Sequence, residues 1–396
     1  MSYLRGSLIA AVTVWMIAAC LFISGCGRTA ETPSDGEKKK ASAASEARQL
    51  ELNDTARFIA GLPLSTDSVL AKMSTLPAWR KYADSFNKNW MSLDKSRMAS
   101  MRKWAGDELR TGSNDNATVF YPFSGPDFLH AATFFPKAGS YVLVALEPVG
   151  TAPDIQHMTP DSMDQYFSAV NRSLQEVLSF SFFKTDNMKV DLKEELNGSL
   201  PILMIFLART ENRIDDIQFV EISDTGDVVT PDASRASGSG RKPPKGVDIT
   251  FRSPDGVEKH LYYFSVNLRN DDLKRSPAFM TYLAKLGTVT SYLKSASYLM
   301  YKDYFSTIRG AILDQSALVV QDDSGIPYGF FKPDKWDVAL YGVYSKPIEM
   351  FVTRKDEQLV RAYQTVNARK PLPFGIGYNW RQGQSNLLVA RKKTGK

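Results

Sequence analysis

The sequence predicts an α+β fold in which amphipathic helices pack on mixed or antiparallel sheets. Apolar residues recur at helical spacing in three long stretches, and short runs rich in β-branched and aromatic residues lie between them. Several of these runs are joined by turn sequences that suit hairpins, which favours α+β over a doubly wound parallel sheet. With 396 residues, 43% of them hydrophobic and 11% aromatic, the chain can form a substantial core.

The longest helical stretch covers residues 66–110, where Pro77 interrupts the pattern. Its aromatic stripe, which includes Trp90, is expected to pack against the core rather than to form a ligand face. Further helices are predicted at residues 160–183, 277–313 and 357–366. Strands are predicted at residues 140–147, 201–207, 214–223, 228–229, 247–251, 260–268, 317–331, 338–344 and 386–390.

A weak internal repeat links the two halves of the chain. One helical stretch leads to Phe-Ser-Gly-Pro-Asp (123–127) and Phe-Phe-Pro-Lys (134–137), and another leads to Asp-Ser-Gly-Ile-Pro (323–327) and Phe-Phe-Lys-Pro (330–333). If this is a true duplication, two lobes divide near residues 230–246, a segment rich in Ser, Gly and Pro. The alternative is chance similarity between turn sequences.

Residues 1–25 have the features of a secretory signal. One basic residue, Arg5, precedes an apolar run from Leu8 to Ile23, which is shorter than the roughly 20 residues that span a bilayer. The string Leu-Phe-Ile-Ser-Gly-Cys-Gly (21–27) resembles the lipobox of bacterial lipoproteins, and that resemblance implies that Cys26 is lipidated and becomes the mature N-terminus. Gly27, in place of aspartate, implies an outer-membrane lipoprotein facing the periplasm if the host is Gram-negative.

The composition changes sharply after the leader. Residues 26–49 lack aromatic and β-branched aliphatic residues and predict a flexible tether, so the folded part is expected to span residues 50–390, followed by a basic tail at 391–396. The formal net charge of +6 comes from the segments outside this folded part, which itself carries equal numbers of basic and acidic residues. Nucleic acid is therefore not an expected partner.

The sequence offers little for metal or thiol chemistry. The chain has two cysteines, one in the leader and one at the lipidation position, so the mature protein is expected to have no free thiol and no disulfide. Its three histidines, His130, His157 and His260, are far apart and lack the spacing of zinc ligands. We expect no metal and no cofactor.

Two constellations could support a cofactor-independent hydrolase. Ser124 and His130 lie with Asp127 in one short segment, although Ser124 capping a helix is the simpler interpretation. Asp224 and Asp323 each begin an Asp-Thr/Ser-Gly triplet of the kind that forms the carboxylate pair of aspartic proteases, but both triplets also suit turns.

A third pattern departs further from its family. Ser291-Tyr-Leu-Lys294 and Lys393-Thr-Gly395 resemble two elements of the serine β-lactamase family. However, Ser291 is expected inside a long helix, and the second element lies at the chain end.

The strings VFYPFSGPDFLHA (119–131) and QDDSGIPYGFF (321–331) resemble segments shared by a group of secreted bacterial proteins to which no activity is attached. The resemblance implies that the two turn regions belong to one recurring architecture, and it supplies no catalytic residue.

The leading expectation is an envelope-anchored binding or scaffolding module for a small ligand or an envelope protein. The two turn segments are expected to lie together and to line the main cleft, because they combine aromatic rings with short polar groups. The residues of this candidate binding cleft are Phe120, Tyr121, Phe123, Ser124, Asp127, His130, Asp322, Asp323 and Tyr328.

Overall fold

The computed structural model describes residues 35–109, 116–180, 196–231, 243–365 and 369–394. The chain divides into two compact units, residues 1–44 and 45–396, and the second unit contains every described strand. The predicted leader, Cys26 and the start of the predicted tether lie outside the described residues. None of the described helices is both long and apolar enough to cross a bilayer.

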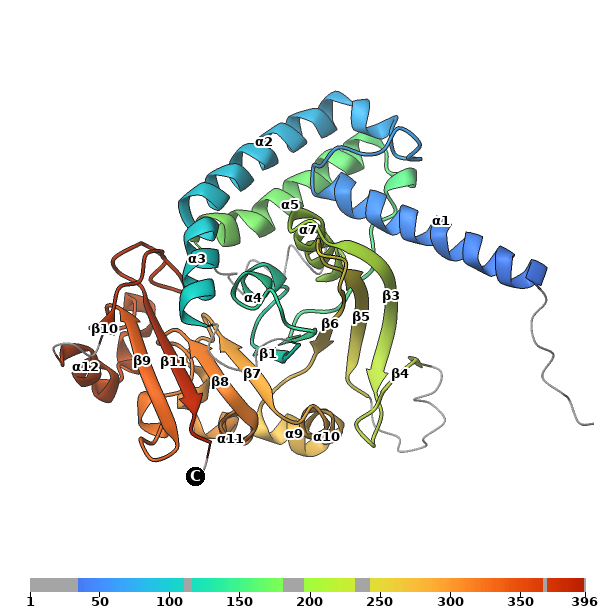
Figure 1. The fold of residues 1–396 in the computed structure, drawn as a ribbon. Helices are drawn as coiled ribbons and strands as arrows, with labels where there is room; N and C mark the ends of the chain where they lie inside the picture. The colour runs from blue at the N-terminus through green and yellow to red at the C-terminus, as the bar shows by residue number, and fades with distance from the viewer. Residues whose placement is uncertain (1–34, 110–115, 181–195, 232–242, 366–368, 395–396) are drawn as a thin grey trace, which may run out of the picture. The chain divides into compact units, whose positions relative to one another are not determined.

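The described strands form one mixed sheet, which confirms the predicted α+β class (Figure 1). Its strand order is β10-β9-β11-β8-β7-β1-β2-β6-β5-β3-β4. The five central strands β8, β7, β1, β2 and β6 run parallel, whereas β11, β5 and β3 pair antiparallel on the two sides. The strands are β1 (Thr118–Pro122), β2 (Ser140–Ala145), β3 (Arg213–Ile222), β4 (Val228–Val229), β5 (Lys245–Arg252), β6 (Glu258–Ser265), β7 (Val289–Leu293), β8 (Ser316–Gln321), β9 (Trp336–Gly342), β10 (Arg369–Lys370) and β11 (Asn386–Lys392).

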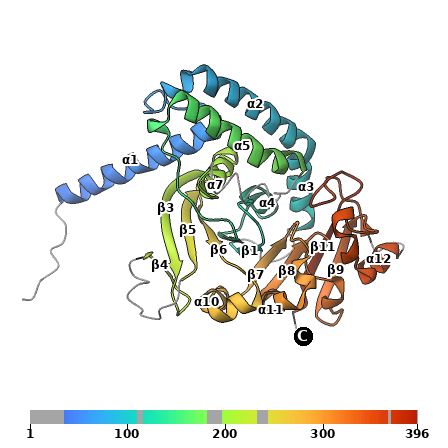
Figure 2. The same cartoon turned by 180° about the vertical axis from the view of Figure 1, so that it is seen from behind.

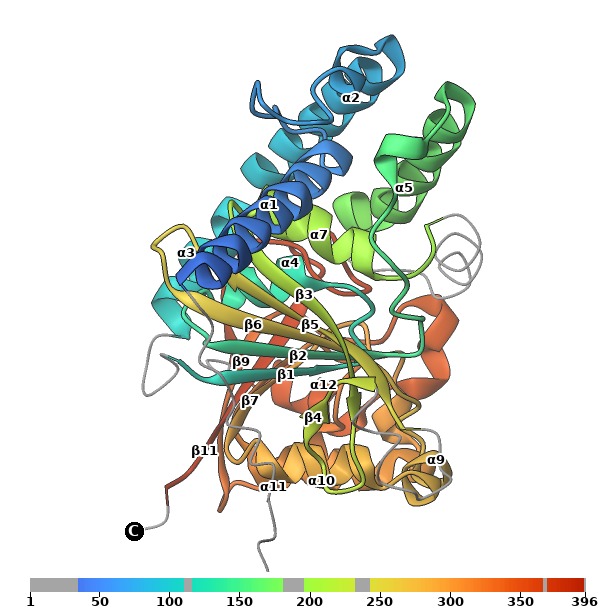
Figure 3. The same ribbon diagram turned by 90° about the vertical axis from the view of Figure 1, so that its right-hand side faces the viewer.

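Helices cover both faces of the sheet, as Figures 2 and 3 show from two further sides. Alternate residues of one strand serve the two layers, since Tyr121 of β1 packs in one core cluster and Phe120 in the other. On the first face lie the part of α1 (Asp35–Ile59) that follows Ala44, and α2 (Pro77–Leu93), α3 (Ala99–Glu108), α4 (Phe128–Phe134), α5 (Pro160–Phe180) and α7 (Leu200–Arg209). On the second lie α9 (Asn270–Arg275), α10 (Ala278–Lys285), α11 (Ser306–Gln315) and α12 (Glu357–Gln364).

Two predicted elements are of the wrong type, and a third, the strand predicted at residues 317–331, ends at Gln321. Residues 201–207 form helix α7 rather than a strand, and its residues 200–208 are all buried. A helix buried on every side has no amphipathic pattern, so a short apolar run does not distinguish it from a buried strand. The better signal was Pro201 at the first turn, a position that favours a helix start.

The second error is the long helix predicted at residues 277–313. The chain leaves helix α10 at Gly287, whose φ of +67° suits a left-handed helix end, and then forms the buried strand β7. Tyr282, Leu286, Val289 and Leu293 happen to follow helical spacing across this boundary. All five residues of β7 are buried because the strand lies in the parallel centre of the sheet.

The sheet also bears on the predicted lobes. Residues 230–246 do not separate two folded units, since strand β5 after this segment pairs directly with β3 before it. The two repeat-like segments differ in topology as well. Strands β1 and β2 are parallel neighbours, whereas β11 lies between β8 and β9.

Helix α1 starts at Asp35, inside the range predicted as a flexible tether. The Ala, Glu and Lys residues of this range are good helix formers. Tertiary contacts hold the C-terminal part of the helix, because Arg48 donates to the Ile217 carbonyl at 3.0 Å and pairs with Asp216 at 3.2 Å. The ordered fold therefore begins before Leu50.

Asn53 of α1 closes the outer edge of β3. Its amide nitrogen donates to the Ile214 carbonyl at 2.7 Å, and its amide oxygen accepts from the Ile214 N–H at 2.9 Å. The side chain thus replaces a neighbouring strand at an edge that would otherwise present unpaired backbone groups.

We expect Asn53→Ala to lower the free energy of unfolding by about 1–3 kcal/mol, because it leaves two backbone groups of Ile214 without partners. Urea denaturation at pH 7 measures the change. Glu51→Ala, at an exposed position of the same helix, is the control and should have little effect. Equal stability of the two variants would show that water satisfies the β3 edge.

Candidate functional site

A cluster of buried polar side chains lies where three parallel strands end. Strand β7 pairs with β1 on one side and with β8 on the other, so the loops that follow these strands leave the same edge of the sheet. They supply Asp127, Lys294 and the consecutive pair Asp322 and Asp323, each at most 3% exposed. The carboxyl edge of parallel strands is where α/β sheets commonly hold ligands.

Asp127 organises the first half of this cluster. It caps helix α4, with Oδ1 accepting from the His130 N–H at 3.3 Å, and the same oxygen lies 2.8 Å from the His130 Nδ1. Its Oδ2 accepts from the Tyr121 hydroxyl at 2.9 Å and from the Lys294 ammonium at 2.6 Å. Ser124, predicted as the cap, instead donates to the Gly125 carbonyl at 2.7 Å.

The charges of this half follow from burial and pairing. Burial alone would raise the pKa of Asp127, but His130 and Lys294 together hold it well below its usual range. Burial, with a smaller effect of Lys294, outweighs the opposing effect of Asp127 and lowers the pKa of His130 to about 4. Burial also lowers the pKa of Lys294, which Asp127 counteracts. At neutral pH we therefore assign an Asp127–Lys294 ion pair beside a neutral His130.

Asp322 and Asp323 form the second half. Asp322 accepts from the backbone N–H of Ser295 at 2.8 Å and of Ser324 at 2.9 Å. Asp323 accepts from the Asn386 amide at 2.9 Å and from the Tyr298 hydroxyl. Burial raises the pKa of both carboxyl groups, and the neighbouring Asp322 helps to raise that of Asp323 to about 7.

The loops at this edge carry unusual backbone strain. Phe123, Ser295, Ser297 and Tyr298 have φ values of 60°, 52°, 53° and 53°, and they make up four of the seven non-glycine residues with positive φ in the described chain. Such conformations cost on the order of 1–3 kcal/mol each and concentrate at functional sites. Holding these loops around the polar cluster therefore lowers the stability of the fold.

The structure brings the two predicted turn segments to one edge, but it closes the space between them. Only β7 separates β1 from β8, which places their ends roughly 10 Å apart. Of the polar candidates Ser124, Asp127, His130, Asp322 and Asp323, even the most exposed, Ser124, is only 6% accessible. Among the aromatic candidates, Phe120 and Tyr121 point to opposite faces of β1, whereas Phe123 and Tyr328 are half-buried.

The predicted catalytic pairs are not formed. Ser124 and His130 share no hydrogen bond in the described structure. Asp224 is exposed in the turn after β3, six strands from β8 and thus roughly 29 Å from Asp323 across the sheet. The carboxyl group beside Asp323 is that of Asp322.

Ser291 lies on strand β7 rather than in a helix, and its hydroxyl bonds to that of Ser316 at 2.7 Å. The other two histidines pair separately, His157 with Asp154 at 2.8 Å and His260 with Asp248 at 3.0 Å. Within the described ranges, no group of three or more His, Cys, Asp or Glu side chains is placed to hold a metal ion.

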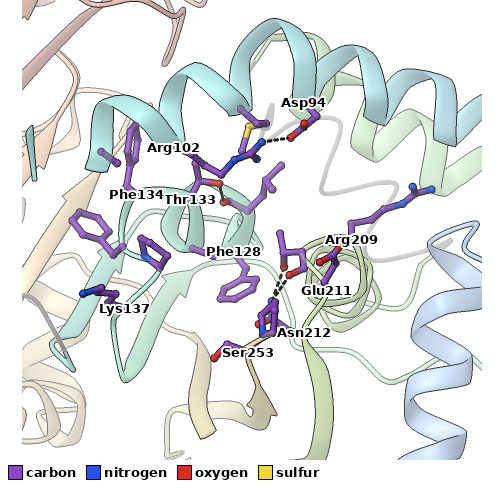
Figure 4. A pocket seen from close by; sticks show the side chains of 18 of the residues that line it. Asp94, Arg102, Phe128, Thr133, Phe134, Lys137, Arg209, Glu211, Asn212 and Ser253 are labelled. Carbon is purple, nitrogen blue, oxygen red and sulfur yellow. Dashed lines mark hydrogen bonds and ion pairs between the residues drawn. The ribbon is translucent and has the colours of Figure 1, made fainter. Parts of the chain in front are cut away.

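A pocket of about 1300 Å³ lies elsewhere on the first face of the sheet (Figure 4). Its walls come from the α2–α3 junction, from α4 and the loop after it, from the C-terminal end of α7, and from the β5–β6 hairpin. None of the nine predicted cleft residues lines it. This pocket is therefore not the cleft that the sequence predicts between the two turn segments.

The pocket has an apolar interior and a charged rim. Its large apolar side chains include Trp90, Met98, Phe128, Leu129 and Phe135. On the rim, Arg102 pairs with Asp94 at 2.7 Å, an interaction drawn in Figure 4.

Two backbone features at the pocket are typical of functional sites. Residues 94–98 form a π-helical turn between α2 and α3, a device that occurs frequently at functional sites, and three of the five line the pocket. Glu211, also in the lining, has a φ of +60°. The positive φ of Glu211 adds backbone strain, and the π-helical turn interrupts the regular α-helix, where the walls of the pocket meet.

Arg209 fixes one wall of the pocket rather than facing its interior. Its side chain runs from α7 toward α2 (Figure 4), where one guanidinium nitrogen donates to Asn87 at 2.6 Å. The guanidinium carbon lies 4.4 Å from the ring centre of Phe86 and 5.5 Å from that of Trp90. Burial lowers the pKa of Arg209 to about 10.

Sequence reasoning missed Lys294 and the pocket. The sequence pattern predicts a helix at Lys294. Its position between Asp127 and Asp322 becomes evident only because the preceding residues form strand β7. The aromatic stripe of residues 66–110 was the available signal for the pocket. Trp79, Tyr82 and Phe86 pack in the core as predicted, whereas Trp90 of the same stripe lines the pocket.

Comparisons with known proteins do not supply a function. No protein-family model, no curated protein and no solved structure matches the chain. The activity must therefore be argued from the residues of this structure.

Proposed function

We propose that the protein is an envelope-anchored lipoprotein whose folded part binds a ligand in the pocket between α2–α3, α4 and the β5–β6 hairpin. The observation that carries the binding function is the pocket itself, which has a volume of about 1300 Å³, a largely apolar interior and a charged rim. Binding pockets typically combine an apolar lining with a few polar groups that orient the ligand. The polar cluster at the strand ends has the composition of a site but is closed to solvent.

Ala132→Trp tests the binding site, because Ala132 is a small half-buried residue of helix α4 in the pocket wall. We expect wild-type protein to yield a copurifying small molecule on organic extraction and mass spectrometry, and the variant to yield several-fold less. Ala362→Trp, at a half-buried position of helix α12 on the other face of the sheet, is the matched control. Equal yields from the two variants would contradict this location.

The anchoring proposal rests on the lipobox-like string around Cys26 and on the composition of the leader. We expect Cys26→Ala to abolish metabolic labelling with a fatty acid and to remove the protein from the salt-washed membrane fraction. Wild-type protein that is never labelled, or a variant that is labelled as strongly as wild type, would contradict lipidation.

A cofactor-independent hydrolase is the alternative function. Its support is the buried pair Asp322 and Asp323, in which one carboxyl group has a pKa near 7 and can hold a proton at neutral pH. Substrate would reach this pair only if the loops after β7 and β8 opened. We favour the binding module because the pocket needs no such opening.

A further inference from the structure

One wall of the pocket contains a lysine that forms no salt bridge with a described carboxylate. Lys259 of β6 lines the pocket and is only 4% exposed. Its ammonium group donates to the Pro136 carbonyl at 2.5 Å, and no described carboxylate lies within salt-bridge distance. An ammonium group has three N–H donors, and a buried charge is costly unless it is paired. A ligand with a negative charge would pair with the Lys259 ammonium group and offset the cost of burying it.

Basic residues outnumber acidic residues in the described lining of the pocket. Among the described residues, this lining contains two acidic residues, Asp94 and Glu211, and the basic residues Lys95, Arg102, Lys137, Arg209 and Lys259. Asp94 is already paired with Arg102. Lys259 has no such partner among the described carboxylates. A negatively charged group is favoured there.

The rest of the pocket suits a flexible apolar chain. Trp90, Met91 and Met98 line the α2–α3 side, and Phe128 and Leu129 of α4 complete the apolar wall. Methionine side chains adapt to irregular or flexible ligands. The volume of about 1300 Å³ also exceeds the roughly 300–1,000 Å³ of typical small-molecule pockets.

We propose that this pocket binds a single-chain amphiphile with an anionic head group, a carboxylate or a phosphate. The Lys259 ammonium binds the head group, and the apolar chain lies along Phe128 and Met98. This inference rests on the proposed binding function and specifies the chemical class of its ligand.

Photo-crosslinking of the full chain tests the proposal. The probe is dodecanoate with a diazirine near the chain end, and mass spectrometry maps the labelled peptides. The competitors are dodecanoate, dodecyl phosphate, dodecanol and dodecyltrimethylammonium. We expect labelling on the α2–α3 segment around Met98, with the anionic competitors at least about tenfold more effective than the neutral and cationic ones. The better of the two anions identifies the head group as carboxylate or phosphate.

Variants connect this preference to Lys259. We expect Lys259→Met, which keeps the length and apolar stem of the side chain, to reduce the preference for anions about tenfold. Lys332→Met, at an exposed lysine outside the pocket, should leave it unchanged. If Lys259→Met does not fold, the competitor series on wild-type protein still decides.

The outcomes separate the two proposals. Labelling of the pocket with equal competition by all four amphiphiles would overturn the anionic ligand and leave the binding function standing. Labelling that never reaches pocket residues would overturn both.

Discussion

Lys294→Met is expected to lower the free energy of unfolding by about 3–5 kcal/mol, the cost of removing one partner of a buried ion pair. Lys294 lies 2.6 Å from Asp127, and both side chains are at most 2% exposed. Without the ammonium group, Asp127 becomes a buried carboxylate that only neutral donors stabilise. Urea denaturation at pH 7 measures the loss.

A double variant distinguishes lost charge balance from lost packing. Asp127→Asn combined with Lys294→Met removes both charges, keeps a cap for α4, and should recover a large part of the stability. Lys285→Met is the control, because it breaks the exposed Lys285–Asp227 pair of the same 2.6 Å length and should cost less than about 1 kcal/mol. If Lys294→Met and Lys285→Met have similar effects, the buried pair is not a major determinant of stability.

The second large effect is a change in how stability depends on pH. The pKa of Asp323 is about 7 in the folded chain, above the value of about 3.9 for an unfolded aspartate. Between these values the folded chain holds a proton that the unfolded chain has lost. The stability from this group is therefore fully present below about pH 4 and is lost as the pH rises to 7. Asp323→Asn removes this loss.

We accordingly expect Asp323→Asn to become more stable relative to wild type as the pH rises from 4 to 7, on the order of 1 kcal/mol for each pH unit. The comparison is made against wild type because His130 acts in the opposite direction. Its folded pKa of about 4 lies below its unfolded value, so its contribution grows with pH over part of the same window. Denaturation curves at several pH values measure the difference. Asp224→Asn, at an exposed turn, should show no such trend, and a flat difference for Asp323→Asn would refute the raised pKa.

Local sequence patterns predicted most elements well. Runs of alternating apolar and polar residues correctly predicted strands β2, β3, β5, β6 and β11. Amphipathic stretches correctly predicted helices α2, α3, α5 and α12. The errors at α7 and β7 share one cause. Both segments are buried on all sides, so neither shows the contrast between apolar and polar faces by which periodicity separates a helix from a strand.

The candidate site was predictable only in part. Asp127, His130, Asp322 and Asp323 were identified from polar residues in the turn segments, and the structure places all four at one sheet edge. Their partner Lys294 is 164 residues from His130 in sequence. No local pattern identifies a partner at such a separation.

The sequence by itself determined the α+β class and a folded part without excess charge, and it predicts a leader with a lipobox-like cysteine. These properties depend on composition and on residues close together in the chain. The tertiary structure decided that β7 lies between β1 and β8, that Lys294 therefore neutralises Asp127, and that the α2–α3 junction and the β5–β6 hairpin enclose a pocket containing Lys259. The physical reason is that strand order and pocket walls arise from contacts between distant segments, which many sequences with the same local periodicity would arrange differently.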